Sequence, residues 1–332
     1  MLFILRSLKY LFVSSLLLSV VVILFELVRS LHQKRSVFDN NTFGKQEKFQ
    51  FARDVDGNSY VERLETINKV CGELTRKGPL SLKNLDVLDH ILVDSKHQLL
   101  YCYVPKVACT NWKRIFMILT GRTNASDVLS IPAHEAHSRS VYLTLRNYTT
   151  IDAEYLLNTY TKFLFVRHPF ERLLSAYRNK LEQNYLSSKY FQERIGKYII
   201  QNYRSSLKNV SQIKGNDVTF EEFTTFLVNS AKNGFNEHWK PIHSLCEPCY
   251  IKYDFVGKYE TLWNDANFIL KSIGVSNFTF PYAPRSSSTS KQLRRYFSNL
   301  SSERISNLYE IYKLDFKMFS YSSADLLGYE VG

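Results

Sequence analysis

The sequence predicts an α/β fold with a largely parallel central sheet flanked by helices. Two segments about sixty residues apart support this class, because each indicates a strand, a tight turn carrying one cation and then a helix. Strand and helix patterns alternate along much of the 332-residue chain, as in α/β proteins. A hydrophobic content of 45% and an aromatic content of 14% are sufficient for a substantial core.

The first segment follows two short apolar runs at 90–93 and 99–104, which predict a hairpin or two neighbouring strands. The pattern then changes to a helical period. Apolar residues recur at i, i+3, i+4 and i+7: Trp112, Ile115, Phe116 and Leu119. We expect Thr110 or Asn111 to cap this helix and Gly121 to end it.

The second segment repeats this order of strand, turn and helix. The continuous apolar run 163–166 is typical of a strand covered on both faces. Pro169 suits the first turn of a helix. The helix that follows has an apolar stripe: Phe170, Leu173, Leu174, Tyr177 and Leu181.

The remaining elements follow in the same alternation. A helix is predicted at 220–228, with Thr219 and Glu222 forming a capping box at its start. A strand is expected at 255–260. Two more helices are expected, at 262–273 and 302–318.

An apolar segment near the N-terminus predicts a membrane anchor. It spans 11–25 apart from three serines, and two further apolar residues bring it to the ~17 residues at the short end of a membrane span. A cleaved signal peptide is the alternative, but no small-residue cleavage site follows. We therefore expect a cytoplasmic tail at 1–9, a signal anchor at 10–28, a lumenal stem at 29–70, partly helical near its end, and a catalytic domain at 71–332.

Glycosylation sequons favour a lumenal body, whereas the basic residues flanking the span do not decide its orientation. The six candidate asparagines are Asn40, Asn124, Asn147, Asn209, Asn277 and Asn299. The predicted topology is therefore that of a type II membrane protein of the secretory pathway.

The chain has five cysteines, so in an oxidising lumen at least one is left free or intermolecular. Cys246 and Cys249 are close enough in sequence to form a small local disulfide. A zinc half-site is the alternative interpretation, although no second matching pair exists.

A formal net charge of +12 indicates an anionic partner such as a nucleic acid, an anionic lipid or an acidic polysaccharide. Nucleic acid has the weakest claim, because the sequence has no arginine-rich tract, zinc finger or helix-turn-helix signature.

Both turns carry groups that can bind phosphate. A helix N-terminus offers unpaired N–H groups, to which the first turn adds the Lys106 ammonium and the Thr110 hydroxyl. The glycines of a Walker A loop are absent, which argues against a kinase or NTPase. In the second segment Arg167 can grip a phosphate and Ser175 can donate another hydrogen bond. Alternatively, Arg167 pairs with Glu171 and Ser175 is a surface residue.

These residues carry a family resemblance. The stretch 105–114, PKVACTNWKR, resembles the 5′-phosphosulfate loop of the Golgi carbohydrate sulfotransferases. Arg167 and Ser175, separated by seven residues, are similar to the family's 3′-phosphate motif. The details resemble the HNK-1, chondroitin and dermatan sulfotransferase group, and its chondroitin 4-O branch in particular. Supporting stretches lie at 131–137, 235–239, 244–249, 253–260 and 309–316, so that the resemblance covers about 70–321.

The resemblance implies a P-loop-like sulfotransferase fold and the donor 3′-phosphoadenosine 5′-phosphosulfate (PAPS), with no metal. The implied donor-binding residues are Pro105, Lys106, Val107, Ala108, Cys109, Thr110 and Asn111, together with Arg167, His168, Pro169, Phe170, Glu171, Arg172, Leu173, Leu174 and Ser175. Lys106 is implied to be catalytic, because it would neutralise charge on the leaving phosphate. Many relatives have an acidic residue in place of His168.

A sugar hydroxyl needs a general base, and histidine is the usual choice. We expect His137 to serve, because relatives also have a histidine at this position. His134 and His238 are the alternatives, with His238 interpreted mainly as a packed residue and Trp239 as able to stack on a sugar. Several basic residues are candidates for steering an acidic chain: Lys113, Arg114, Arg122, Arg139, Arg172, Arg178 and Lys180.

The function that these expectations describe is sulfation of O4 of N-acetylgalactosamine in chondroitin by a Golgi membrane enzyme. The expected partners are an acidic glycosaminoglycan or glycoprotein glycan acceptor and the Golgi membrane, and not nucleic acid. Dermatan or another terminal sugar is the alternative acceptor. An inactive glycan-binding membrane protein is the alternative of a different class.

Overall fold

The computed structural model describes residues 58–74, 86–205, 213–230, 234–275, 277–282, 288–328 and 331, which belong to one compact unit. The predicted tail, the anchor at 10–28 and most of the stem lie outside the described residues. Within the described ranges, no helix combines the length and the apolar character that a bilayer crossing requires.

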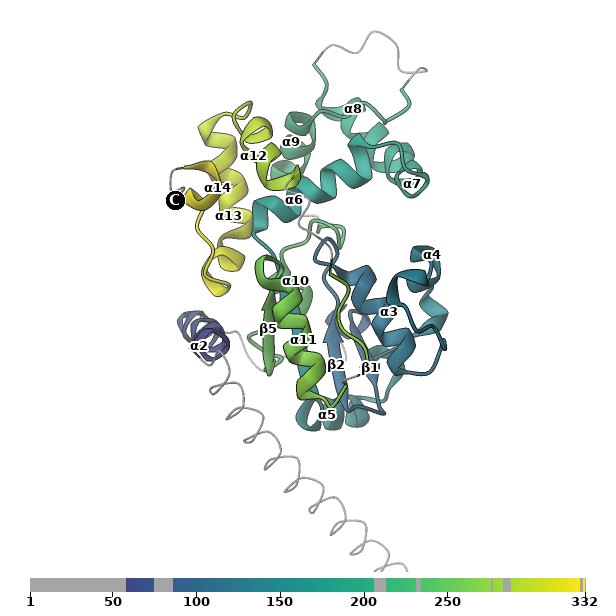
Figure 1. Ribbon diagram of the computed structural model, residues 1–332. Helices are drawn as coiled ribbons and strands as arrows, with labels where there is room; N and C mark the ends of the chain where they lie inside the picture. Colours follow the sequence, from purple (N-terminus) through teal and green to yellow (C-terminus); the bar gives the residue numbers. More distant parts are fainter. Residues whose placement is uncertain are drawn as a thin grey trace, which may run out of the picture. The chain divides into compact units, whose positions relative to one another are not determined.

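The central sheet has the order β3-β1-β2-β4-β5 in the described part of the chain (Figure 1). Its strands are β1 Ile91–Asp94, β2 Leu99–Cys102, β3 Leu143–Thr144, β4 Thr161–Val166 and β5 Phe255–Lys258. Strand β4 runs parallel to β2 and β5, whereas β1 runs antiparallel to β2 and β3. The α/β class and the hairpin are confirmed. The sheet is mixed rather than largely parallel, because the hairpin and the edge strand reverse direction.

Helices cover the sheet and form a second layer beyond the carboxyl ends of β2 and β4 (Figure 1). The helices beside the sheet are α2 Asn58–Glu73, α3 Cys109–Leu119, α4 Ala133–Ala136, α5 Thr150–Thr159, α10 Ile242–Cys246 and α11 Leu262–Ser272. The second layer comprises α6 Pro169–Tyr177, α7 Lys189–Phe191, α8 Lys197–Tyr203, α9 Phe220–Ser230, α12 Ser288–Phe297, α13 Ser302–Met318 and α14 Ala324–Leu327. The capping box predicted before α9 is confirmed by reciprocal bonds between Thr219 and Glu222.

An aromatic cluster fixes α3 against the sheet. The Trp112 ring lies 4.6 Å from Phe163, 5.4 Å from Phe165 and 5.3 Å from Phe280, measured between ring centroids. Burying such rings gives a large apolar contribution with a defined geometry. Because Trp112 lies in the first turns of α3, the cluster holds the helix N-terminus at the ends of β2 and β4.

The second layer has its own core beneath α6. Phe170 of α6 contacts Phe297 of α12 at 4.8 Å and Phe316 of α13 at 5.0 Å. Leu173 and Leu174 are also buried in this cluster. The predicted apolar stripe of α6 therefore anchors the layer, which sets the position of the turn that precedes the helix.

Two disulfides connect distant parts of the chain. Cys71 of α2 bonds to Cys249, and Cys102 of β2 bonds to Cys246 of α10. Cys109 is a free, buried cysteine, as the odd count requires. The predicted local Cys246–Cys249 disulfide is wrong, because each sulfur faces a partner brought by the fold. The same pairing removes both thiolates from the alternative zinc site.

The sequon asparagines in the described part of the chain are all solvent-exposed: Asn124, Asn147, Asn277 and Asn299. Asn40 and Asn209 lie outside the described residues.

Candidate active site

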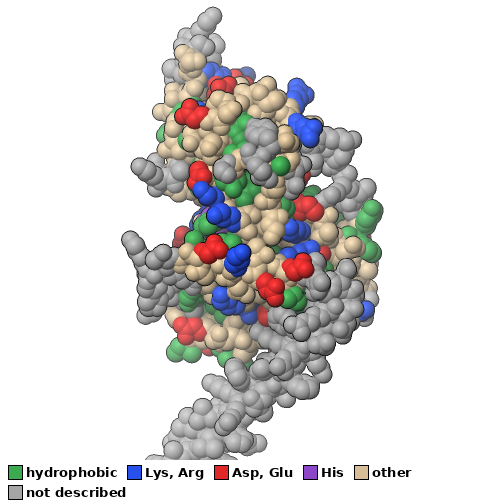
Figure 2. Space-filling view, turned by 90° about the vertical axis from the view of Figure 1, so that its left-hand side faces the viewer, with side chains coloured by type: hydrophobic (Ala, Val, Ile, Leu, Met, Phe, Trp, Pro, Cys, Tyr) green, Lys and Arg blue, Asp and Glu red, His purple; other side chains and the backbone are tan. Residues whose placement is uncertain are grey.

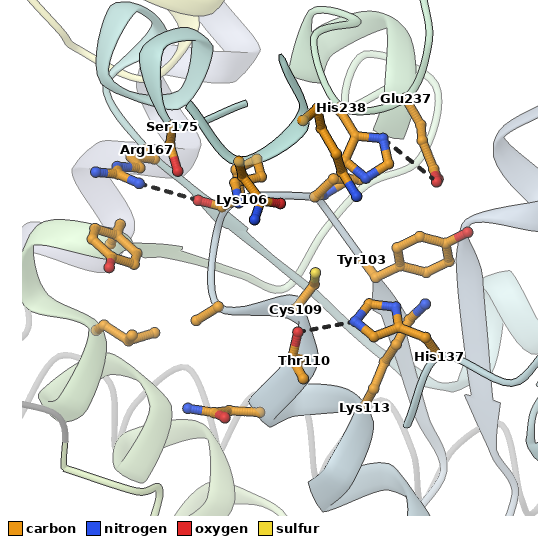
Figure 3. Close-up of a pocket in the computed structure, with 17 residues that line it drawn as sticks. Tyr103, Lys106, Cys109, Thr110, Lys113, His137, Arg167, Ser175, Glu237 and His238 are labelled. Carbon is orange, nitrogen blue, oxygen red and sulfur yellow. Dashed lines mark hydrogen bonds and ion pairs between the residues drawn. The ribbon is translucent and has the colours of Figure 1, made fainter. Parts of the chain in front are cut away.

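A cavity of 360 Å³ lies where β2 and β4 end and α3 and α6 begin (Figure 3). Eight residues of the predicted donor site line it: Pro105, Lys106, Ala108, Cys109, Thr110, Asn111, Arg167 and Ser175. The other eight do not: Val107, His168, Pro169, Phe170, Glu171, Arg172, Leu173 and Leu174. These eight are buried, so they support the residues that line the cavity and do not face it themselves.

The turn between β2 and α3, residues 105–109, has an unusual backbone. Lys106 and Ala108 have φ angles of 72° and 56°, in the left-handed region that side chains disfavour. Such strain of roughly 1–3 kcal/mol per residue is typical of ligand-binding sites. The predicted cap by Thr110 or Asn111 is wrong, because Ala108 is the N-cap and no side chain caps the helix. The first N–H groups of α3 are thus open to an anion.

Lys106 extends into a strongly basic environment. Burial, together with the nearby cations Lys180, Arg167 and Arg172, lowers the pKa of its ammonium to about 8, with Cys109 partly offsetting the decrease. A bound anion would reverse this effect by compensating the clustered charge. The cavity therefore favours a ligand with more than one negative charge.

Arg167 and Ser175 lie together on one side of Lys106 (Figure 3). The Arg167 guanidinium donates to Glu171 Oε2 from Nε at 3.1 Å and from Nη2 at 3.0 Å, and from Nη1 to the Lys106 carbonyl at 3.4 Å. The ion pair with Glu171 considered as an alternative is present. It orients the guanidinium without exhausting its five donors, so two N–H groups are available to a phosphate.

Arg172 connects the turn at 105–109 to the loop that contains Glu237 and Lys240. This fully buried guanidinium donates to the carbonyl oxygens of Pro105 at 3.0 Å, Glu237 at 2.9 Å and Lys240 at 2.6 Å. It does not face solvent, so the prediction that it steers an acceptor is wrong. It instead fixes the turn that carries Lys106 against the loop that carries Glu237.

His137 lies against the start of α3, directly after the turn at 105–109. Its Nε2 is 3.0 Å from Thr110 Oγ1 (Figure 3). Burial and the surrounding cations, foremost Lys113 and Lys180, lower the pKa of its imidazole to about 4. The ring is therefore neutral at pH 7, the form that a general base requires, and a bound anion would raise its pKa by compensating the surrounding cations. His134, one turn earlier, does not line the cavity.

His238, named from the sequence as an alternative base but interpreted mainly as a packed residue, also lines the cavity. Its Nδ1 lies 2.7 Å from Asn236 Oδ1 and its ring meets Phe191 edge-on at 5.1 Å. Burial and nearby cations lower the pKa of this imidazole to about 2. Trp239 is buried, so the prediction that it stacks on a sugar is wrong.

Five lining residues were not assigned to the site from the sequence: Tyr103, Asn179, Glu237, Tyr259 and Leu262. Two more, Lys113 and Lys180, were named only as candidates for steering the acceptor. Asn179 and Lys180 come from the π-helix η6, Arg178–Glu182, which continues α6. Single π-turns are frequent at functional sites. The basic character of Lys113 and Lys180 was the available sequence signal, and Glu237 gave none.

Basic side chains, interspersed with acidic ones, gather at mid-height between the sheet-containing part and the second helical layer (Figure 2). Not every predicted steering residue is free for this role. Arg114 donates to the Ile131 carbonyl and to Asn111, and Arg178 pairs with Glu182 at 3.2 Å. Lys113, Lys180 and Arg139 remain as cations that line cavities.

Comparisons with known proteins agree with this geometry. Residues 89–322 match the model of the sulfotransferase family. The chain is 49% identical over 245 residues to carbohydrate sulfotransferase 11 of Rattus norvegicus, covering 72% of this chain and 69% of the relative. It is 40% identical over 283 residues to carbohydrate sulfotransferase 14 of Danio rerio, covering 81% and 74%.

A third relative, carbohydrate sulfotransferase 8 of Homo sapiens, is 35% identical over 277 residues, covering 81% of this chain and 64% of the relative. No solved structure matches the chain significantly. The extent of these matches leads to one conclusion: the chain belongs to the sulfotransferase family and is a carbohydrate sulfotransferase.

Proposed function

We propose that this enzyme transfers the sulfuryl group of PAPS to O4 of N-acetylgalactosamine in chondroitin. The observation that carries the donor assignment is the placement of two anion-binding groups in one cavity. Lys106 and the α3 N-terminus form one group, and Arg167 with Ser175 forms the other (Figure 3). The strand, turn and helix order of β2–α3 and β4–α6 supports a P-loop-like sulfotransferase architecture.

Arg167 and Ser175 hold the 3′-phosphate in this proposal. The guanidinium is already oriented by Glu171 and by stacking at 4.3 Å on the Tyr259 ring. Binding a phosphate therefore costs little further conformational entropy of this side chain. Fixing the far end of the donor aligns its sulfur for in-line attack.

Lys106 and the open N–H groups of α3 bind the 5′ end. As the sulfur–oxygen bond breaks, negative charge grows on the phosphate oxygen, and these donors are already in place to stabilise it. His137 takes the proton of the attacking sugar hydroxyl, since its imidazole is neutral and lies beside Thr110.

The proposed location is the Golgi membrane, with a type II anchor at 10–28 and a lumenal catalytic domain. Two disulfides support an oxidising compartment. The exposed sequon asparagines Asn124, Asn277 and Asn299 support glycosylation in the same compartment. The proposed acceptors, glycosaminoglycan or glycoprotein glycans, are made there.

The acceptor is tested by transfer of labelled sulfate from PAPS to chondroitin, desulfated chondroitin, dermatan and N-acetylgalactosamine glycoproteins. We expect chondroitin to be the best acceptor, and the digested product to contain N-acetylgalactosamine 4-sulfate. A preference for dermatan would replace the chondroitin assignment. Sulfate found only at another hydroxyl would refute the proposed position.

A further inference from the structure

A second cavity, of 600 Å³, opens beside the donor cavity. Four residues line both cavities: Tyr103, Lys113, His137 and Glu237. In Figure 3 these four lie on the side of Lys106 opposite Arg167 and Ser175. The second cavity therefore reaches the part of the first cavity that His137 lines.

The walls of the second cavity are polar and carry both charges. Besides the shared residues, its lining includes the carboxylates of Asp86 and Asp89, the amide of Asn236 and the guanidinium of Arg139. Carboxylates and amide oxygens accept hydrogen bonds from hydroxyl groups, whereas cations bind carboxylates. This combination suits a ligand rich in hydroxyls that carries separate negative charges.

The wall is also held in place. The Tyr142 hydroxyl lies 2.9 Å from the Lys113 carbonyl and 3.0 Å from the Ala136 carbonyl, connecting α3 to the end of α4. The Lys113 ammonium lies 3.9 Å from the centre of the Tyr103 ring. Tyr142 and Lys113, which line the second cavity, are therefore held by defined partners.

Arg139 differs from the neighbouring arginines. Arg114 is bound to the Ile131 carbonyl, and Arg146 pairs with Asp89 at 3.4 Å. Arg139 lies two residues after His137 in η4, Arg139–Val141, and is exposed. Its guanidinium forms no ion pair with any residue that the structure describes. Its planar fork matches a carboxylate in two parallel hydrogen bonds.

We propose that the second cavity binds the acceptor chain and that Arg139 binds the carboxylate of a uronic acid adjacent to the sugar that receives sulfate. The inference rests on the proposed function, which supplies an acceptor containing uronic acid. Asp86, Asp89 and Glu237 then accept hydrogen bonds from sugar hydroxyls, and the acceptor hydroxyl points at His137.

The test is calorimetric binding of unsulfated chondroitin oligosaccharide to the full-length enzyme saturated with 3′-phosphoadenosine 5′-phosphate. Arg139→Ala should weaken binding roughly tenfold, as expected for loss of a charge-assisted pair, and leave nucleotide affinity unchanged. Arg122→Ala is the matched control, because Arg122 is exposed and lines neither cavity. It should bind as the wild type does.

A second ligand isolates the carboxylate. With chondroitin oligosaccharide whose uronic acids are reduced to neutral sugars, wild type and Arg139→Ala should bind equally. The inference would be overturned if wild type and Arg139→Ala bound the acidic oligosaccharide equally, or if the wild type did not bind it. It would also be overturned if Arg122→Ala lost as much affinity as Arg139→Ala, or if the loss in Arg139→Ala persisted with the reduced ligand. Sulfate transfer by the wild type is measured separately, so failure of the proposed function is distinguished from failure of this inference.

Discussion

At the scale of single residues, the site depends on charges held where water is partly excluded. Lys106, Lys113 and Lys180 all have pKa values lowered by burial. In the free enzyme these clustered cations repel one another, and a bound anion would relieve that repulsion. This arrangement makes donor binding depend on pH.

The pKa of Lys106, about 8, sets the direction of that dependence. The protonated ammonium binds the anion, and protons are lost as pH rises through the pKa. Affinity for 3′-phosphoadenosine 5′-phosphate should therefore fall between pH 7.5 and 9.5, as measured by calorimetry. Lys106→Arg, which stays protonated, should show a flatter profile. An equally steep profile in this variant would assign the pH dependence to another group.

His137 is the predicted general base, and its replacement tests the role directly. His137→Ala should lower kcat roughly 10²- to 10⁴-fold with nucleotide affinity intact, as measured by steady-state transfer of labelled sulfate. His134→Ala, on the exposed side of α4, is the control and should retain activity. A large loss in His238→Ala with normal turnover in His137→Ala would move the role to His238.

At the scale of elements, the donor turn is held by the buried Arg172 rather than by a helix cap. A lysine at this position cannot reach three carbonyl oxygens at once. Arg172→Lys should therefore lower the free energy of unfolding by roughly 3–5 kcal/mol, because buried acceptors lose their donors. Denaturant titration measures this change.

Arg178→Lys is the matched control, because Arg178 has only a partly exposed pair with Glu182. Such pairs contribute about 0–1 kcal/mol. Equal destabilisation by both substitutions would show that Arg172 is not a special connection between the loops.

Elements with a strong period were predictable from the sequence. The helix expected at 302–318 is α13, and both strand–turn–helix units are present. The cap of α3 was not predictable, because the turn relies on strained backbone at Lys106 and Ala108 rather than on a polar side chain. The two-residue strand β3 and the π-helix η6 also leave no period in the sequence.

At the scale of the whole molecule, contacts between distant segments account for what the sequence did not reveal. Glu237 lies far from Lys106 in the sequence and reaches the site only because the fold places its loop beside the turn at 105–109, where Arg172 of α6 binds both. The disulfides have sequence separations of 178 and 144 residues, so spacing along the chain favoured the wrong local pair. By contrast, Lys106, Thr110, Arg167 and Ser175 lie in compact motifs, and the structure brings them into one cavity.

The disulfide pattern gives a prediction for the folded protein. Non-reducing peptide mapping should find Cys71 bonded to Cys249, Cys102 bonded to Cys246, and Cys109 free. In the chain-entropy model each long loop stabilises the fold by about 5 kcal/mol. Reduction should therefore lower the melting temperature markedly. A peptide containing a Cys246–Cys249 bond would contradict the described fold.

The central claim is that sulfuryl transfer takes place at Lys106. Its most direct test is a single-turnover measurement in which enzyme saturated with labelled PAPS is mixed with chondroitin. The wild type should transfer the label to chondroitin, whereas Lys106→Ala should transfer it at least 100-fold more slowly, roughly the effect of removing a charge-stabilising donor. Transfer by Lys106→Ala at the wild-type rate would contradict the claim.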